Sequence, residues 1–381
     1  MNWKNIPMKT EIQMVDLYGQ YLKIKDEVDT AIKDVISSSV FIKGGRVNTF
    51  ENNLGNYLDS EVIACGNGTD ALQLAFMALE LEPGSEVITT PFTFVATVEV
   101  LVLLGLKPVF VDVCAENFNI NVSDIEKSIT SKTRAILPVH LYGQSSNMEA
   151  INTLAEKYHL AVVEDAAQSL GTEYLFQNGS HKKSGTMGTI GCTSFFPSKN
   201  LGAFGDGGAI FTRDSELALK IRSLANHGMS RRYYYDRIGV NSRLDNIQAA
   251  ILDVKLRYLE QYVASRQSAA AWYDNSLQGI EGLEIPARVP FSTHSFHQYT
   301  VKVQKRDELQ RFLLSRGIPT MVYYPESIHL QEAYTFLGYN HGDFPVSEAL
   351  TRQVLSLPMH TELTEKQLDW ITSSIRTFFR Q

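Results

Sequence analysis

Residues 65–71 (CGNGTDA) combine glycines, a threonine and an aspartate directly after an apolar, β-branched run. The positions that follow are apolar at helical spacing, so the segment is expected to begin a helix. Glycines at such a start leave backbone N–H groups free to bind an anion, and Thr69 and Asp70 can cap the helix. The segment therefore predicts a phosphate site, with a plain glycine turn as the alternative.

The spacing Gly66-x-Gly68-x-x-Ala71 also matches a loose dinucleotide-binding pattern. A dinucleotide site needs an acidic residue at the end of the next strand, where it holds a ribose hydroxyl. That strand ends at residues 89–91 (TTP), without an acid. The sequence therefore disfavours nicotinamide and flavin dinucleotides.

Asp165 stands at the expected end of an apolar strand, within residues 162–169 (VVEDAAQS). A buried carboxylate is costly unless a cation meets it, so we expect Asp165 to have a positively charged partner. The alternative is a structural role as the N-cap of a helix that follows.

Lys199 lies between an aromatic strand and a loop with four glycines in seven residues, within residues 192–208 (CTSFFPSKNLGAFGDGG). Lysine forms Schiff bases only as the free amine, and lowering its pKa from about 10.4 to 7 requires about 4.6 kcal/mol. A partly buried position beside another cation could supply that shift, and the glycines could let a planar ligand approach the backbone. The alternative is a solvated surface amine.

Together the three segments offer a phosphate site, a partner for a protonated pyridine nitrogen and a lysine for a covalent link. This is the set of groups that pyridoxal phosphate requires. Other catalytic patterns are weak, because the sequence has no Gly-x-Ser-x-Gly motif and no nucleoside-triphosphate loop. His294 and His297 lack a third ligand at recognisable spacing, so no metal site is predicted.

The elements that must position these residues are strands alternating with helix-like segments between residues 61 and 212. Such alternation predicts an α/β fold with a mostly parallel sheet covered on both faces, whose ligands bind beyond the carboxyl ends of the strands. The expected strands are residues 61–65, 86–90, 108–113, 134–141, 160–165, 192–196 and 207–212.

No glycine or proline interrupts the chain between Gly239 and Gly279, and apolar residues recur there at helical spacing, which predicts one long amphipathic helix. Beyond it, a strand at 298–303 and helices at 305–316 and 364–379 suggest a smaller α+β domain. We therefore expect a large domain, residues 1–255 with an N-terminal arm, and a small C-terminal substrate domain, residues 256–381.

Composition limits the possible partners. Hydrophobic residues at 44% and charged residues at 20% are ordinary globular usage, and a net charge of −7 without long charged runs gives little attraction for nucleic acid or membranes. Three widely spaced cysteines indicate a reducing, cytoplasmic compartment. Residues 1–9 lack the apolar segment of a signal peptide, and no run of about 20 apolar residues could span a membrane. Small molecules and a second copy of the chain are the expected partners.

Six motifs extend this interpretation, and they occur together in one known family. They are residues 66–72 (GNGTDAL), 91–97 (PFTFVAT), 136–144 (ILPVHLYGQ), 164–171 (EDAAQSLG), 194–212 (SFFPSKNLGAFGDGGAIFT) and 239–252 (GVNSRLDNIQAAIL). Through them the sequence resembles the DegT/DnrJ/EryC1/StrS family of nucleotide-sugar aminotransferases over nearly its whole length. The resemblance implies a type I pyridoxal-phosphate transferase fold.

The resemblance also implies roles for individual residues. Lys199 would hold pyridoxal 5′-phosphate as an internal aldimine and carry protons, and Asp165 would bind the pyridine nitrogen. The other cofactor contacts that it implies are Gln168 at the ring hydroxyl, Phe94 on the ring face, and Gly68, Thr69 and Ser194 at the phosphate. Asn241, directed at the phosphate, and Arg243, as a substrate contact, would reach into a neighbouring subunit's site. The expected active unit is therefore a homodimer with shared active sites.

Subgroup likeness, carried by residues 227–245 and 355–360, suggests a substrate. It implies amino transfer from an amino acid, with glutamate expected, to C3 of UDP-2-acetamido-2-deoxy-3-oxo-glucuronate, for lipopolysaccharide or other surface polysaccharides. The substrate contacts that we expect are Arg231, Arg243, Tyr323, Tyr324 and His329, where Tyr323 replaces a histidine of many relatives. A 4-keto sugar, a dTDP-linked 3-keto sugar and a non-catalytic regulatory or secretion-linked role are the alternatives.

Overall fold

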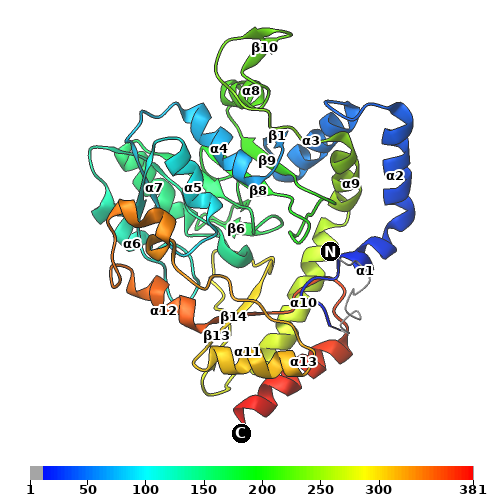
Figure 1. The fold of residues 1–381 in the computed structure, drawn as a ribbon, viewed down its shortest axis with the longest axis vertical. Coiled ribbons are helices and arrows are strands. Elements are labelled where there is room, and N and C mark those ends of the chain that lie inside the picture. Colours follow the sequence, from blue (N-terminus) through cyan, green and yellow to red (C-terminus); the bar gives the residue numbers. More distant parts are fainter. Residues whose placement is uncertain (1–11, 381) are drawn as a thin grey trace.

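A seven-stranded sheet forms the larger body of the protein, as the computed structural model of residues 12–380 describes it (Figure 1). β9 runs antiparallel to both of its neighbours, and the other strands are parallel to one another, so the predicted mostly parallel sheet is confirmed. In spatial order the strands are β1 (Glu61–Cys65), β9 (Gly208–Thr212), β8 (Ile190–Ser194), β5 (Ala161–Asp165), β4 (Thr133–Ile136), β2 (Glu86–Thr89) and β3 (Lys107–Phe110).

Helices cover both faces of this sheet, because successive strand residues point to opposite sides. Ile63 and Val163 pack with α4 (Gly68–Leu79), α5 (Ala96–Leu103) and α8 (Ser215–Leu224). Val62 packs on the other face with α3 (Gly45–Leu58) and α9 (Asn246–Leu256), while Val162 packs with α7 (Met148–Tyr158). The carboxyl ends of the parallel strands therefore open at one edge of a sheet buried on both faces.

A smaller body contains the antiparallel strands β12 (Leu283–Glu284), β13 (Tyr299–Val303) and β14 (Val354–Leu357). They pack with α10 (Leu259–Leu277), α11 (Arg306–Ser315) and α13 (Glu365–Phe379), so the strand and helices predicted after residue 297 are confirmed. Ile12 is buried in this same core, and the Met359 N–H donates to the Met14 carbonyl at 3.2 Å. The predicted domain boundary falls at the end of α9 and remains a proposal.

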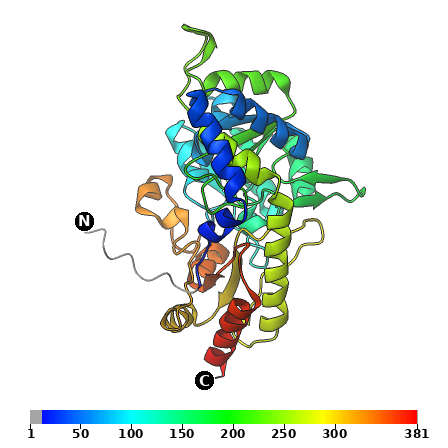
Figure 2. The same cartoon turned by 90° about the vertical axis from the view of Figure 1, so that its right-hand side faces the viewer.

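The single long helix predicted between residues 239 and 279 is wrong, because the chain forms two helices, α9 and α10. At the junction the Tyr258 N–H bonds to the Lys255 carbonyl at 3.0 Å, a tighter turn than an α-helix makes. The Tyr258 hydroxyl is bound by Glu27 on α2 (Lys25–Ser38). Tertiary contacts therefore bend the chain where no glycine or proline marks a break, and α10 runs from the larger body into the smaller one (Figures 1 and 2).

A hairpin of β10 (Met229–Arg231) and β11 (Tyr234–Tyr235) projects beyond the larger body at the top of both views (Figures 1 and 2). Its tip carries exposed aromatic side chains, with Tyr233 70% exposed. The remaining elements are α1 (Leu17–Lys23), α6 (Val122–Ile125), β6 (Glu173–Leu175), β7 (His181–Lys183), α12 (Pro345–Gln353) and the 3₁₀ helices at Glu126–Ser128, Leu141–Gly143, Ile328–Leu330 and Glu332–Leu337.

Three sequence predictions concern the chain's surroundings. No helix within residues 12–380 is long and apolar enough to cross a membrane. All three cysteines are free, with Cys65 and Cys192 buried. The expectation that residues 1–9 contain no signal peptide, and most of the predicted N-terminal arm, lie outside the described residues.

Candidate active site

The three segments singled out in the sequence meet at one cavity of about 620 Å³. It opens at the carboxyl ends of β1, β2, β5 and β8, where an open α/β sheet binds its ligands. Nine of the predicted site residues line it: Gly68, Thr69, Phe94, Asp165, Gln168, Ser194, Lys199, Tyr323 and Tyr324. Segments up to 256 residues apart in sequence, from Gly68 to Tyr324, therefore form one site.

The start of α4 provides the anion-binding end of the cavity. Asn67 caps the helix by accepting the Asp70 N–H at 2.8 Å, so the prediction that Thr69 or Asp70 is the cap is wrong. No described group accepts the N–H of Gly68 or Thr69. A Cβ on Gly68 would lie 2.6 Å from the Cβ of Ser194, so glycine is needed for the helix to meet β8. The N–H groups of Gly68 and Thr69 and the hydroxyls of Thr69 and Ser194 are thus available to a phosphate.

Asp165 is 6% exposed and lies at the end of β5. Its Oδ2 accepts the Thr97 hydroxyl at 2.8 Å, and its Oδ1 accepts the Ala167 N–H at 3.2 Å. Residues 167–171 form turns, which leaves no helix for the alternative N-cap role. Asp165 has no ion pair among the described residues, so the positively charged partner that we expected is not supplied by this part of the chain. A buried carboxylate facing a cavity fits a cationic ring nitrogen of a ligand.

Lys199 lies in the loop after β8 and lines the same cavity. Burial lowers its pKa to about 8, while the charge of Asp165 acts in the opposite direction. The expected effect of burial is therefore confirmed, whereas the expected contribution of a neighbouring cation is wrong, because desolvation alone lowers this pKa. A lysine with this pKa is partly unprotonated near neutral pH, which a nucleophilic amine requires.

Two of the glycines after Lys199 lie where another backbone segment of the same chain passes very close to them. A Cβ on Gly202 would lie 2.2 Å from the Pro197 carbonyl oxygen, and a Cβ on Gly208 would lie 2.3 Å from that of Asn67. Both distances are shorter than any real contact, so these glycines permit tight chain crossings. The glycines of this loop are not among the residues that line the cavity, and the expectation that they let a planar ligand approach the backbone stays a prediction.

Gln168 is held in one orientation between two tyrosines. Its Oε1 accepts the Tyr142 N–H at 2.8 Å, and its Nε2 donates to the Tyr324 hydroxyl at 3.1 Å. Burial raises the pKa of Tyr324, so the phenol stays protonated at neutral pH. The rings of Tyr324 and Phe94 have centroids 6.2 Å apart. One N–H of the Gln168 amide remains for a ligand.

Several residues that line the cavity, or that bond to residues lining it, were not predicted individually. Tyr142 and Thr97 lie inside recognised motifs, where a left-handed Tyr142 (φ 58°) and a buried threonine carry no signal of their own. His297 lines the cavity, and burial, Lys199 and Arg266 lower the pKa of this imidazole. Ser242 ties the site to α4, because its hydroxyl donates to Asp70 at 2.6 Å and accepts the Gly66 N–H at 2.9 Å.

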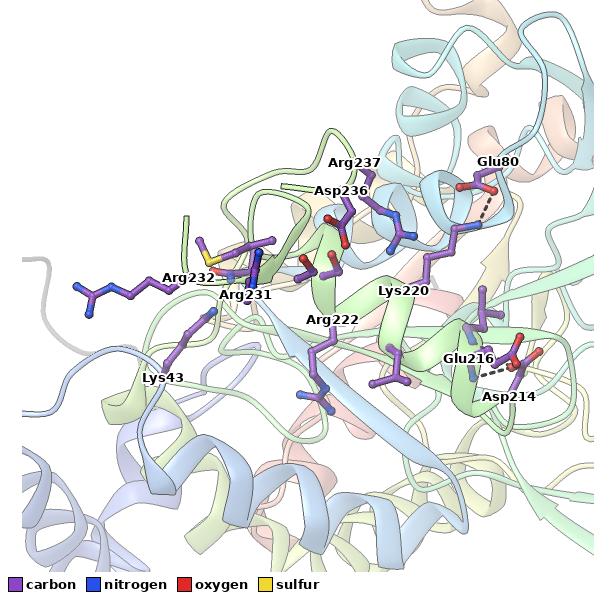
Figure 3. A pocket seen from close by; sticks show the side chains of 16 residues that line it. Lys43, Glu80, Asp214, Glu216, Lys220, Arg222, Arg231, Arg232, Asp236 and Arg237 are labelled. Carbon is purple, nitrogen blue, oxygen red and sulfur yellow. Dashed lines mark hydrogen bonds and ion pairs between the residues drawn. The ribbon is translucent and has the colours of Figure 1, made fainter. Parts of the chain in front are cut away.

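Asn241, Arg243 and Arg231 do not line this cavity. Asn241 and Arg243 flank the buried Ser242, Asn241 being exposed and Arg243 partly so. Arg231 is on the hairpin and lines a second pocket of about 950 Å³ between α8 and the hairpin (Figure 3). These three predicted site residues therefore lie outside the cavity of their own chain.

The second pocket, which we call the basic pocket, is lined by six cationic and four acidic side chains. Lys220 pairs with Glu80 at 2.7 Å, and Arg222 pairs with Glu51 at 2.8 Å. The other four cations, Lys43, Arg231, Arg232 and Arg237, have no carboxylate within 4 Å among the described residues. In Figure 3 the Lys43 side chain reaches toward the hairpin that carries Arg231 and Arg232.

His329 is also outside the cavity. It is 1% exposed, its Nε2 lies 3.1 Å from the Glu348 carboxylate, and its ring packs against Phe344. These contacts give it a structural hydrogen bond, and none of them supports the substrate contact that we expected.

A mostly parallel sheet, a lysine loop at the strand ends and a smaller C-terminal body define a type I pyridoxal-phosphate transferase fold. Residues 22–376 match the DegT/DnrJ/EryC1/StrS aminotransferase family, and the chain belongs to that family.

Relatives cover almost the whole chain. It is 46% identical over 97% of its length to a Geobacillus stearothermophilus protein named pleiotropic regulatory protein, of which 99% is covered. It is 44% identical over 96% of its length to the UDP-2-acetamido-2-deoxy-3-oxo-D-glucuronate aminotransferase of Pseudomonas aeruginosa, of which 99% is covered. The crystal structure of S. venezuelae DesV with a ketimine intermediate superposes with a TM-score of 0.94 at 36% identity, covering 98% of this chain and 100% of DesV.

Proposed function

We propose that this protein is a pyridoxal-phosphate-dependent aminotransferase acting on a nucleotide-linked keto sugar. One observation carries the proposal: Lys199, with its lowered pKa, and Asp165, which has no ion pair among the described residues, line one cavity beside a helix N-terminus with two free backbone N–H groups. A phosphate, a cationic ring nitrogen and an aldehyde would each find a matching group there. When bound, pyridoxal phosphate supplies an electron-withdrawing ring that stabilises a carbanion at the carbon carrying the amino group.

Each residue of the chain has a role in this proposal. Lys199 forms the covalent link and moves a proton to and from carbon, for which its lowered pKa suits it. Asp165 keeps the ring nitrogen protonated, and the free N–H of Gln168 binds the ring hydroxyl. Phe94, 53% exposed, offers its ring face to the cofactor. Gly68, Thr69 and Ser194 bind the phosphate.

We further propose that the active unit is a homodimer in which each chain completes the other's site. Asn241, Arg243 and Arg231 lie outside the cavity of their own chain, so they would act on the cavity of a second copy. Asn241 would bind the phosphate there. Arg243, Arg231 and Lys43 would bind the anionic groups of the sugar nucleotide, because guanidinium groups form paired hydrogen bonds with phosphate and carboxylate. Tyr323 and Tyr324, inside the cavity, would donate to sugar oxygens.

The substrate that we propose is UDP-2-acetamido-2-deoxy-3-oxo-glucuronate, aminated at C3 with glutamate as donor, for lipopolysaccharide or another surface polysaccharide. Likeness to the P. aeruginosa enzyme supports it. The relative named a regulatory protein does not change the chemistry proposed for this chain, because Lys199, Asp165 and Gln168 are all present in one cavity.

The cofactor proposal is tested by absorbance. Purified protein with pyridoxal phosphate should show an absorbance band that borohydride reduction removes. After reduction, the cofactor should be found covalently attached to the peptide that contains Lys199. Lys199→Ala should bind the cofactor without showing that covalent band, whereas Lys255→Met, which replaces a buried lysine outside the cavity, should keep the band. An unchanged band in Lys199→Ala would refute the role of Lys199.

The substrate proposal is tested with UDP- and dTDP-linked sugars carrying a keto group at C3 or C4. Protein converted to the pyridoxamine form with glutamate should regain the lysine-linked band on mixing with the UDP-linked 3-keto uronate. A response to 4-keto sugars alone would refute amination at C3, and a response to dTDP-linked 3-keto sugars alone would refute the uronate.

A further inference from the structure

Two buried threonine hydroxyls stand in line behind Asp165. Thr97, in the first turn of α5, is fully buried, and Thr93, one turn earlier and 3% exposed, lines the cavity. Their Oγ1 atoms are 2.9 Å apart, and the Oγ1 of Thr97 is 2.8 Å from the Oδ2 of Asp165. The three side chains thus form one continuous row from the cavity wall to the carboxylate.

The direction of these hydrogen bonds follows from the number of protons. An ionised carboxylate only accepts, so Thr97 must give its single hydroxyl proton to Asp165. The Thr97 oxygen can then only accept from Thr93, which makes Thr93 the donor of the other bond. Hydrogen bonds in such a row polarise one another, so the second hydroxyl strengthens the first.

The contact made by Thr97 differs from the local alternative. A threonine in a helix commonly bonds to the carbonyl four residues earlier, as Thr372 does to Leu368 at 2.9 Å. Thr97 instead bonds to a side chain 68 residues away, on a different element. Because the Ala167 N–H binds the other carboxylate oxygen, Asp165 is fixed at both oxygens.

We propose that Thr97 is a positioning residue that orients the Asp165 carboxylate toward the ring nitrogen of the cofactor, with Thr93 as the second link. The inference rests on the proposed function, because it needs a pyridine ring at Asp165. It assigns to residues 91–97 a role beyond that of Phe94. Loss of the hydroxyl would loosen the carboxylate, weaken cofactor binding and move the pH at which the bound cofactor changes its absorbance.

The test compares Thr97→Val, which keeps the shape, with Thr97→Ser, which keeps the hydroxyl. Apoprotein is titrated with pyridoxal phosphate to obtain its dissociation constant, and the absorbance of the complex is then followed against pH. Thr97→Val should bind the cofactor about tenfold more weakly and shift the spectral midpoint by about half a pH unit or more, because hydrogen bonds to charged groups are among the stronger ones. Thr97→Ser should stay within about twofold of wild type, and Thr93→Val should fall between them.

Wild-type values for Thr97→Val in both measurements would overturn the inference. Equal losses in Thr97→Val and Thr97→Ser would also overturn it, because packing rather than the hydroxyl would then be responsible. If Thr97→Val does not fold, as judged by thermal unfolding of the apoprotein, Thr93→Val carries the test, and an unchanged spectral midpoint there would overturn the row of hydrogen bonds. Failure of the wild type to bind pyridoxal phosphate would instead refute the proposed function.

Discussion

The cofactor cavity and the basic pocket differ in how their polar groups are satisfied. In the cavity, Asp165 accepts two hydrogen bonds, and Gln168 accepts one and donates one, all with groups of the same chain. In the basic pocket, Lys43, Arg231 and Arg232 are without a carboxylate partner among residues 12–380. One chain therefore builds a preorganised cofactor site, while these cations of its basic pocket lack a carboxylate partner among the described residues.

Unpaired positive charge at the basic pocket is the basis for proposing that an anionic ligand or a second chain completes it. Burial lowers the pKa of Lys43, and repulsion by Arg243 lowers it further. The chain as a whole carries a net charge of −7, so the unpaired cations of the basic pocket form a local positive region on a protein that is negatively charged overall. An anionic substrate held in a second copy's cavity would supply the missing charge, because local fields rather than net charge attract it.

The largest expected effect on activity comes from a dimer in which one chain carries a defective cavity and the other lacks Arg243. Lys199→Ala and Arg243→Ala homodimers should each be inactive, the first by about four orders of magnitude or more. Mixed heterodimers contain one site with both residues intact, so random mixing should restore about a quarter of wild-type activity. Amination of the keto sugar in mixtures of known composition is the measurement.

The matched control for this mixture is Lys199→Ala combined with Asp165→Asn. Both changes damage the cavity of their own chain, so every heterodimer has two defective sites and no activity should return. Restoration in the control, or its absence in confirmed Lys199→Ala and Arg243→Ala heterodimers, would contradict a site shared between chains.

A smaller effect is expected from the basic pocket alone. The double substitution Arg231→Ala and Arg232→Ala should raise the KM for the nucleotide sugar about 10- to 100-fold, because hydrogen bonds to charged groups contribute about 1.5 to 3 kcal/mol. The absorbance of the bound cofactor should not change, since these arginines lie outside the cavity of their own chain and are proposed to contact the sugar nucleotide rather than the cofactor. The dependence of KM on salt should also weaken.

Arg311→Ala, on the exposed side of α11, is the control for this double substitution and should leave KM unchanged. Equal KM values and equal salt dependence for wild type and the double variant would show that Arg231 and Arg232 of the basic pocket do not take part in substrate binding. A loss of the cofactor band would show instead that the two regions are not separable.

The same contrast explains what could be predicted from the sequence. Lys199, Asp165 and Gly68 each lie in a contiguous motif at a strand end, so their types and order identified the cavity. The row from Thr93 to Asp165 could not be found that way, because it depends on how α5 packs beside β5. The break between α9 and α10 was missed for a related reason, since Tyr258 is held by a residue more than 200 positions away.

The smallest expected effect concerns Lys255, the buried lysine beneath the Lys199 loop. Its ammonium group is bound by the Gly202 carbonyl and lies 5.5 Å from the Phe204 ring centroid. Burial, and then Arg266, lower its pKa to about 7 from 10.5. Between these values the unfolded chain binds more protons than the folded one, so this group makes stability rise with pH.

Comparing wild type with Lys255→Met isolates this contribution, because Lys199, with its pKa of about 8, titrates in both proteins. Wild-type apoprotein should gain about 1 kcal/mol more than the variant between pH 7 and 8, measured by urea unfolding. Lys366→Met, at an exposed position on α13, should follow the wild-type curve. Parallel curves for wild type and Lys255→Met would mean that Lys255 does not lose its proton in this range. The cofactor cavity and the basic pocket would then differ less, because Lys255 would remain a charged cation without a carboxylate partner beside the cavity, as Lys43 and Arg231 are in the basic pocket.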